Sequence, residues 1–289
     1  MSMYEFVRAS RAIVNGPLFR SSRLKWERSQ FLSPQNLGAH FGVYRDFAEA
    51  WRALPQSPGF NTDALVHEYV DVRTKRVFEY DYAIMHWLEG AFRMGATHVL
   101  DIGGSVGVHY YAYRRYLTMP AGLTWEIVEV PEIAAIGRQL ARTNSAKALH
   151  FTTDLQAALS SSAEVWLSCG AIQYFEDAYP ATLLALSAKR PAHILLNKLP
   201  LHNGEAFVTT QNLGFGSFSP VHIFDRCRFV RAIEAQGYKL EDCWDVHERS
   251  MYIPGHPTRS FATFSGLYFV DTGKVGVPAQ APTTSPASR

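Results

Sequence analysis

Cysteine is scarce in this chain of 289 residues, and its three copies, Cys169, Cys227 and Cys243, lack the C-x-x-C spacing of a metal site. So few cysteines give no disulfide framework and are typical of a reduced, cytoplasmic protein. Long apolar runs are also missing. None approaches the roughly 18 residues that a membrane span needs, and the N-terminus lacks the apolar core of a signal peptide. We therefore expect a cytoplasmic protein with no membrane span.

A strong net charge is absent as well, because 28 Lys and Arg face 26 Asp and Glu. Charge alone therefore gives no reason to expect a nucleic acid partner. The first thirty residues are more basic, with six Lys or Arg against two Glu. This excess fits a solvated amphipathic segment or one that contacts a membrane surface or an anionic partner, and the sequence leaves both open.

The hydrophobic content of 47% is enough for one large domain with an added N-terminal part. Residues 1–94 are expected to be a helical addition or lid, because apolar side chains recur with helical spacing in residues 46–54 and 78–94. Residues 95–272 are expected to form the main domain. Residues 273–289 are rich in Pro, Ala, Ser and Thr, and we expect them to be a disordered tail.

The main domain has the pattern of an α/β fold. Strands are expected at residues 98–102, 123–130, 148–154, 163–170 and 192–199, and helices at 107–117, 131–144, 176–190 and 224–237. This alternation predicts an open, mostly parallel sheet with helices on both faces. The runs 238–247 and 260–270 have no helix between them and should pair antiparallel. Residues 200–222 are expected to be irregular, and so long a connection is usually functional or mobile.

The stretch HVLDIGGSVGVHYY, residues 98–111, places a glycine-rich turn directly after the first strand of this sheet. Ligands of open parallel sheets bind at the carboxyl ends of the strands, where glycines let a ligand approach the backbone. The dinucleotide fingerprint G-x-G-x-x-G fails, because the third and sixth positions counted from Gly103 are Ser105 and Val108. The P-loop pattern is absent too, so the turn indicates a ligand of another kind.

Two acidic residues narrow the choice of ligand. Asp101 comes directly before the glycines, where it would repel a pyrophosphate but suit an ammonium group. Glu129 ends the next strand, where a carboxylate can accept hydrogen bonds from both hydroxyls of a ribose. A ligand with a ribose, a positive charge and no pyrophosphate matches S-adenosyl-L-methionine, which carries adenosine, a sulfonium and an amino-acid end.

Three segments resemble motifs of the class I S-adenosylmethionine-dependent methyltransferases. VLDIGGSVG (99–107) resembles their first motif, IVEVPEI (127–133) their second-strand motif and SCGAIQYFEDAY (168–179) their fourth-strand segment. The resemblance covers residues 97–270 and implies the Rossmann-like sheet of that class. The segments FGVYRDFAEAW and FVTTQNL are similar to a family of bacterial methyltransferases whose members often occur with polysaccharide-biosynthesis genes.

The resemblance implies roles for the matching residues. Asp101 and the glycines of the turn would line the methionine end of the cofactor, and Glu129 would hold its ribose. Asp154 closes the third strand and could contact the adenine amino group, although a turn or helix-cap role fits it equally. The segment from Ser168 to Gly170 would pass beside the sulfonium. The cofactor-binding residues expected are Asp101, Gly103, Gly104, Ser105, Gly107, Glu129, Asp154, Ser168 and Gly170.

The expected activity is methyl transfer from S-adenosyl-L-methionine to an oxygen of a small molecule or glycan. The cofactor supplies the electrophile, while the protein aligns the acceptor and provides a base for a hydroxyl. His202 and His222 flank the irregular segment and are the main candidates for the base, with His109 a third. Tyr174 could orient an acceptor hydroxyl or simply pack. Further polar candidates are Gln173, Gln211, Asn212, Tyr80, Asp81, Tyr82 and His86.

Other functions stay open at this point. A non-catalytic module that binds S-adenosylmethionine or S-adenosylhomocysteine is one, because no single catalytic base stands out. A nicotinamide-dependent oxidoreductase is disfavoured by the glycine spacing. No metal is expected, since the carboxylate and amide cluster of metal-dependent relatives is not evident. The sequence specifies neither the acceptor nor the oligomeric state.

Overall fold

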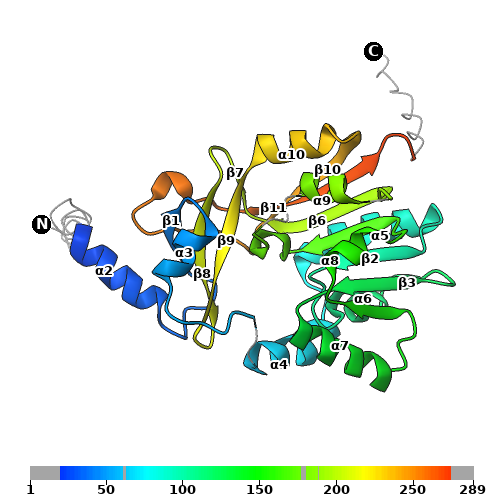
Figure 1. Cartoon of the computed structure of the whole chain (residues 1–289), viewed down its shortest axis with the longest axis horizontal. Coiled ribbons are helices and arrows are strands. Elements are labelled where there is room, and N and C mark those ends of the chain that lie inside the picture. The colour runs from blue at the N-terminus through cyan, green and yellow to red at the C-terminus, as the bar shows by residue number, and fades with distance from the viewer. Residues whose placement is uncertain (1–19, 61–62, 177–179, 188, 275–289) are drawn as a thin grey trace, which may run out of the picture.

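The structure, a computed structural model, consists of two β-sheets that lie side by side, a larger one on the right of Figure 1 and a smaller one on the left. No described helix is long and apolar enough to cross a membrane. The first 19 residues and the expected tail from residue 275 lie outside the described part of the chain. The residues that the structure describes are 20–60, 63–176, 180–187 and 189–274.

The larger sheet has seven strands, most of them parallel. In the order in which they lie across the sheet they are β10 (Tyr238–Val246), β11 (Phe264–Asp271), β6 (His193–Leu199), β5 (Val165–Cys169), β2 (His98–Ile102), β3 (Thr124–Val128) and β4 (Leu149–Thr152). β11 runs antiparallel to both of its neighbours, and the remaining pairs are parallel. The predicted α/β class, a Rossmann-like sheet with a terminal antiparallel pair, is therefore confirmed.

Three helices pack on each face of this sheet. One face carries α5 (Tyr82–Arg93), α6 (Val108–Tyr113) and α7 (Pro131–Thr143), and the other carries α8 (Leu155–Leu159), α9 (Pro180–Leu186) and α10 (Arg226–Glu234). Because successive strand residues point to opposite faces, Val99 joins the first core and Leu100 the second. Both are fully buried, and burial of such a side chain contributes about 1.5–3 kcal/mol.

Local signals set several helix ends where the sequence predicts them. α7 begins at Pro131, whose missing N–H is not needed in the first turn of a helix. Asp225 caps α10 by accepting a hydrogen bond from the Arg228 N–H at 2.8 Å, and Gly237 follows the helix with a φ of 88°. The short helix α8 is not predicted, because five residues are too few to show a helical period.

The smaller sheet corrects two expectations. Its strands, in order across the sheet, are β1 (His40–Tyr44), β8 (Phe207–Gly214), β9 (Ser217–Asp225) and β7 (Leu201–His202). Residues 200–222 are therefore not irregular, because most of them form the β8–β9 hairpin. Residues 1–94 are not purely helical either, because β1 pairs antiparallel with β8. The expected boundary at residue 94 does not separate two independent units.

Hydrogen bonds across the sequence hold the N-terminal segment to this hairpin. The Thr210 hydroxyl donates to the Phe41 carbonyl at 2.6 Å. The Asn212 amide donates to the carbonyls of Phe31 and Ser33, each at 2.7 Å. The N-terminal helices that accompany β1 are α2 (Arg20–Phe31), α3 (Phe47–Ala53) and α4 (Asp63–Asp71). Of these, α3 lies in the first segment that the spacing predicts as helical.

Candidate functional site

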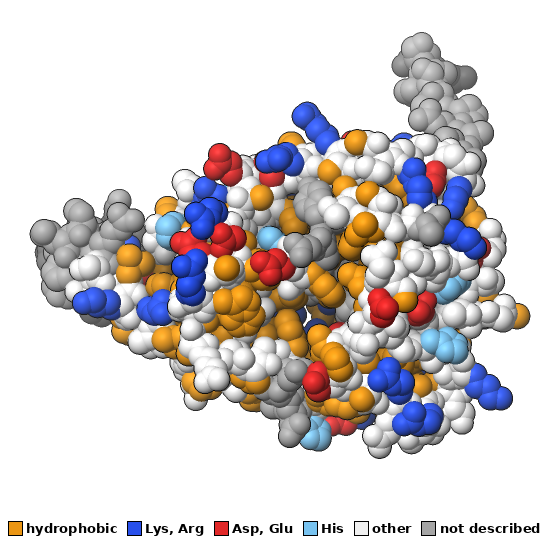
Figure 2. Space-filling view, in the orientation of Figure 1, with side chains coloured by type: hydrophobic (Ala, Val, Ile, Leu, Met, Phe, Trp, Pro, Cys, Tyr) orange, Lys and Arg blue, Asp and Glu red, His pale blue; other side chains and the backbone are white. Residues whose placement is uncertain are grey.

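A cavity of about 370 Å³ lies where the carboxyl ends of the parallel strands face the smaller sheet. Figure 2 shows the molecule hollowed near the centre of this face, with hydrophobic side chains around the hollow. The segments that follow β2, β3 and β5, with the end of β6, line one side, and β1, β8 and β9 line the other. Its size falls in the range of roughly 300–1,000 Å³ that is usual for small-molecule sites.

The glycine-rich turn after β2 forms part of this cavity. Gly103 has a φ of 73°, Gly107 a φ of 99° and Ser105 a φ of 55°, all in the left-handed region that favours glycine. A Cβ on Gly103 would overlap the side chain of Ala171. The buried Ser105 hydroxyl has no hydrogen-bond partner among the described residues. The turn therefore offers bare backbone and one unsatisfied hydroxyl to a ligand.

Asp101 does not line the cavity but lies beneath the turn. It is fully buried, and its carboxylate lies 2.9 Å from Nδ1 of His109 and accepts a bond from the Trp125 indole N–H at 3.2 Å. Burial lowers the pKa of His109, but the negative charge of Asp101 outweighs this and raises that pKa well above its usual value. His109 does line the cavity, as a cation that Asp101 holds in place. An imidazole that is already protonated cannot accept a proton from an acceptor.

Glu129 lies beside the glycine turn and lines the cavity. Ile102 pairs with Val128 in the sheet, so Gly103 and Glu129 are the first residues after these two neighbouring strands and lie at the same edge of the sheet. Burial raises the pKa of Glu129 to about 7, although hydrogen bonds from the backbone of Val130 and Ser105 oppose the shift. A partly buried carboxylate at this strand end is a hydrogen-bond acceptor for a ligand that enters between the two turns.

Two of the other expected cofactor residues make local structural bonds instead. Asp154 is exposed and caps α8 by accepting a bond from the Ala157 N–H at 3.0 Å, which is the helix-cap role that its position also allowed. The buried Ser168 hydroxyl donates to the Ile102 carbonyl at 3.0 Å and does not line the cavity. Gly170 does line it, with a φ of 83°.

The two histidines expected as bases lie away from the cavity. His202 bonds through Nε2 to the Glu205 carbonyl at 2.9 Å. His222 is the residue after Val221, which lines the cavity, so strand alternation turns its side chain to the opposite face of β9. There it packs on Phe47 at 4.4 Å between ring centroids. The assignment of these histidines as bases is therefore wrong for this cavity.

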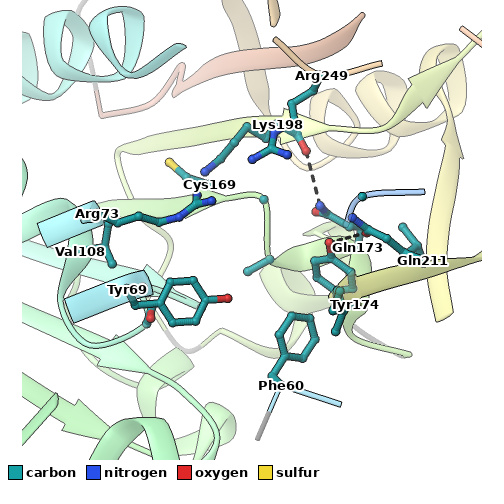
Figure 3. Close-up of a pocket in the computed structure, with 18 of the residues that line it drawn as sticks. Phe60, Tyr69, Arg73, Val108, Cys169, Gln173, Tyr174, Lys198, Gln211 and Arg249 are labelled. Carbon is teal, nitrogen blue, oxygen red and sulfur yellow. Dashed lines mark hydrogen bonds between the residues drawn. The ribbon is translucent and has the colours of Figure 1, made fainter. Parts of the chain in front are cut away.

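Among the polar candidates after β5 and on β8, Gln173, Tyr174 and Gln211 line the cavity. Tyr174 lines the cavity and donates a hydrogen bond to Gln211 Oε1 at 2.7 Å (Figure 3). Burial raises the pKa of Tyr174 to about 12, so its hydroxyl stays protonated. Gln173 also lines the cavity, and its buried Oε1 has no partner among the described residues. Asn212 faces the other way and bonds to the N-terminal segment, as described above.

Of the N-terminal candidates, none lines the cavity. Tyr80 is buried and stacks on Phe78. Asp81 is buried and accepts a hydrogen bond from the Tyr113 hydroxyl at 2.9 Å. Tyr82 and His86 are exposed on α5. Of these four side chains, only Asp81 has a hydrogen bond, among the described residues, that ties this segment to α6 of the main domain.

Sequence reasoning missed several residues that do line the cavity. They share no motif and come from separate parts of the chain: His40, Phe60, Tyr69, Arg73, Lys198 and Arg249. Burial lowers the pKa of His40 to about 4, so this imidazole is neutral near pH 7. The only local signal was Lys198, two residues after the apolar run of HILLNKL, since a lysine is unusual at the end of a buried strand.

The residues present fit S-adenosyl-L-methionine. Bare backbone at Gly103, the unpartnered Ser105 hydroxyl and the Glu129 carboxylate meet at one cavity. Within the described ranges, no group of three His, Cys, Asp or Glu is arranged to hold a metal ion.

No protein-family model matches the chain, and no curated protein matches it. Solved structures share part of its arrangement. The N-terminal domain of EvdMO1, with S-adenosylhomocysteine bound, is 18% identical with a TM-score of 0.44, over 78% of this chain and 94% of that chain. The 1,6-didemethyltoxoflavin-N1-methyltransferase of Burkholderia thailandensis is 16% identical with a TM-score of 0.46, over 72% and 86%. Magnesium protoporphyrin IX methyltransferase of Synechocystis PCC 6803 is 14% identical with a TM-score of 0.44, over 66% and 81%.

These scores stay below 0.5 and the identities below 20%, so they establish no activity for this chain. Its fold rests on its own strand order.

Proposed function

We propose that this protein is an S-adenosyl-L-methionine-dependent methyltransferase that acts on a small molecule or glycan. The observation that carries the proposal is the meeting of the glycine turn and Glu129 at one cavity. Bound there, the cofactor would supply an electrophilic methyl group. The backbone of Gly103 and Gly104 and the hydroxyl of Ser105 would hold its methionine end, and the Glu129 carboxylate would accept bonds from the ribose.

An oxygen is the proposed acceptor atom, and the opposite side of the cavity would position it. Tyr174, Gln173 and Gln211 offer a hydroxyl and two amides, which suit a ligand with several hydroxyls. His40 replaces His202 and His222 as the candidate proton acceptor, because it lines the cavity; its lowered pKa leaves it unprotonated but also makes it a weak base. A sugar acceptor is favoured by the resemblance to a family linked with polysaccharide biosynthesis.

The cofactor assignment is tested by calorimetric titration of S-adenosylhomocysteine into the wild type and Glu129→Ala. Loss of hydrogen bonds to a charged acceptor costs about 1.5–3 kcal/mol each, so binding should weaken tenfold or more. Glu132→Ala is the matched control, since Glu132 is exposed in the first turn of α7. Equal affinities in the wild type and Glu129→Ala would contradict the assignment of Glu129.

A second candidate function is a module that binds the cofactor without catalysis. The observation in its favour is that neither predicted base reaches the cavity. Incubation with methyl-labelled S-adenosylmethionine and bacterial extracts separates the two. Transfer of label that is lost in Glu129→Ala supports the enzyme. Tight binding of S-adenosylhomocysteine with no transfer in any extract favours the module.

A further inference from the structure

Three basic side chains line the cavity from distant parts of the chain. Arg73 belongs to the 3-10 helix η2 (Arg73–Lys75), Lys198 to the end of β6 and Arg249 to the connection between β10 and β11. Figure 3 shows the three side chains extending toward the same part of the cavity. Burial lowers the pKa of Lys198. The positive charges of Arg73 and Arg249 lower it further, whereas Cys169 and Asp81 act to raise it. The three cations are therefore close enough to repel one another.

The three cations differ in their partners. Arg73 forms an ion pair with Glu68 at 2.8 Å, and η2 packs against α6, the helix that follows the glycine turn. Among the described residues, no carboxylate oxygen lies within 4.0 Å of the charged nitrogens of Lys198 or Arg249. Both lie near Tyr80 instead, with Lys198 Nζ 4.9 Å from the centre of its ring and the charge of Arg249 acting to lower the pKa of its hydroxyl.

The backbone holds Lys198 in this position at a cost. Its φ of 53° is in the left-handed region, which is strained for a residue other than glycine. Asn197 Oδ1 accepts a bond from the Lys198 N–H at 3.0 Å, and the Asn197 amide donates to the Tyr80 carbonyl at 2.7 Å. Gly170 makes room for the side chain, since a Cβ there would lie 3.1 Å from Lys198 Cε. Strain that is fixed in this way occurs most often at functional sites.

The charges that line the cavity do not balance. Glu68 offsets Arg73, and Glu129 is the proposed partner of the ribose. The proposed cofactor adds a sulfonium and an ammonium against one carboxylate, so its binding would increase the positive surplus. Partly buried charges without a partner are costly, and an anionic ligand would offset them.

We propose that Lys198 and Arg249, with Arg73 beside them, bind an oxyanion of the methyl acceptor, either a carboxylate or a phosphate group. The inference rests on the proposed function and narrows the acceptor to acidic small molecules or acidic glycans. A guanidinium and an ammonium together suit such a group, because they offer charge-assisted hydrogen bonds. Gln173, whose buried Oε1 lacks a partner, lies beside this position and donates to the Lys198 carbonyl at 3.5 Å.

The test uses inorganic phosphate and malonate as probes. Each is titrated by calorimetry into the wild-type protein saturated with S-adenosylhomocysteine, at an ionic strength kept constant with sodium chloride. We expect at least one probe to bind. Phosphate alone would identify a phosphate-bearing acceptor, malonate alone a carboxylate-bearing one, and binding of both a site for either group.

The variants Lys198→Met and Arg249→Gln should each weaken binding of the probe about tenfold or more, because each removes a charged hydrogen-bond donor. Lys147→Met and Arg142→Gln are matched controls that remove the same charges from exposed positions, and their affinities should stay within twofold of the wild type. Lys198→Arg should restore most of the affinity. Circular dichroism and S-adenosylhomocysteine binding verify that each variant is folded.

When the wild type binds S-adenosylhomocysteine, two results would overturn the proposal. One is that neither probe binds the loaded wild type more tightly than chloride does. The other is that the probes bind only the free protein and that Lys198→Met and Arg249→Gln weaken the binding of S-adenosylhomocysteine. These cations would then hold the cofactor's own carboxylate. If S-adenosylhomocysteine fails to bind the wild type, the proposed function fails instead. The same titrations into the free protein then support the oxyanion site if the two variants lose the probe, and overturn it if they do not.

Discussion

The two sides of the cavity are built in different ways. One, the glycine wall, consists of Gly103 to Val108 with Glu129, which follow neighbouring parallel strands within about thirty residues. The other, the hairpin wall, consists of His40 on β1, Gln211 and Leu213 on β8 and Val221 on β9. Its residues are up to 181 positions apart, by subtraction of 40 from 221. A local wall is suited to a ligand shared by many proteins, and an assembled wall to a ligand of this protein alone.

The largest effect is expected from Gly103→Ala in the glycine wall. The new Cβ would overlap Ala171, so the turn must shift, and binding of S-adenosylhomocysteine should weaken by about a hundredfold or more, a difference of about 2.8 kcal/mol. Gly122→Ala is the matched control, because Gly122 has nearly the same φ (74° against 73°) but nothing within 4 Å of the added Cβ. It should lose about 1 kcal/mol of stability and keep its affinity. Calorimetry and denaturant unfolding measure both.

If Gly103→Ala binds as well as Gly122→Ala does, the cofactor does not rest on the glycine wall. The comparison between the two walls would then lose its basis.

A pH effect of about tenfold is expected from Glu129. Its pKa of about 7 means that it is mostly ionised at pH 8 and mostly protonated at pH 6. The ionised form accepts both ribose hydrogen bonds, so affinity for S-adenosylhomocysteine should fall about tenfold from pH 8 to pH 6. Glu129→Gln should flatten this profile. A profile that is equally steep in both proteins would assign the effect to another titrating group.

The raised pKa of Glu129 has the opposite effect on the stability of the free protein, which falls as the pH rises while the affinity for the cofactor increases. A carboxyl whose folded pKa is raised favours folding below its unfolded pKa of about 4.3, and it loses that contribution as the pH rises to about 7. Glu129→Gln should therefore stabilise the free protein at pH 8, by about 1–2 kcal/mol, and have little effect near pH 4. Denaturant unfolding at the two pH values checks this, and equal effects at both would contradict the raised pKa.

The smallest effect is expected from Tyr174→Phe, which removes a hydroxyl that bonds to the hairpin wall. Gln211 Oε1 would lose its donor, so the unfolding free energy should fall by about 1 kcal/mol. Affinity for S-adenosylhomocysteine should stay within twofold, because the glycine wall is unchanged. Tyr252→Phe is the control, since its hydroxyl bonds to Glu27 at an exposed site and its loss should cost little. A large loss of cofactor affinity in Tyr174→Phe would place the cofactor against both walls.

The glycine wall was predictable because its parts are close in the sequence. The run VLDI lies in β2, as the alternation of apolar runs with helical segments predicts. Gly103 and Gly107 after it have the left-handed φ that such turns require. The position of Glu129 was also predictable, because neighbouring parallel strands end at the same edge of the sheet. Asp154 shows the limit of this logic. It too ends a strand, yet the turn after it begins α8, and the carboxylate caps that helix.

The hairpin wall was not predicted, because β8 shows no strand pattern in its sequence and β1 lies far away in the chain. TTQN in β8 has no apolar alternation, and β8 pairs both with β9, its hairpin neighbour, and with β1, about 170 positions earlier. The expectation of an irregular segment there misplaced His202 and His222. Val221 and His222 are neighbours in β9, so their side chains point to opposite faces of the sheet. Only the folded structure decides which of these faces borders the cavity.

The sequence by itself determined the parallel sheet, its antiparallel end and the turn at which a cofactor can meet bare backbone. Periodicity, glycine conformation and the edge shared by parallel strands are local properties, and residues a few positions apart suffice to express them. Only the tertiary structure decided which charges share the cavity. Arg73, Lys198 and Arg249 meet because the N-terminal segment, β6 and the connection between β10 and β11 pack together, and the repulsion between such cations is set by distance in space rather than along the chain.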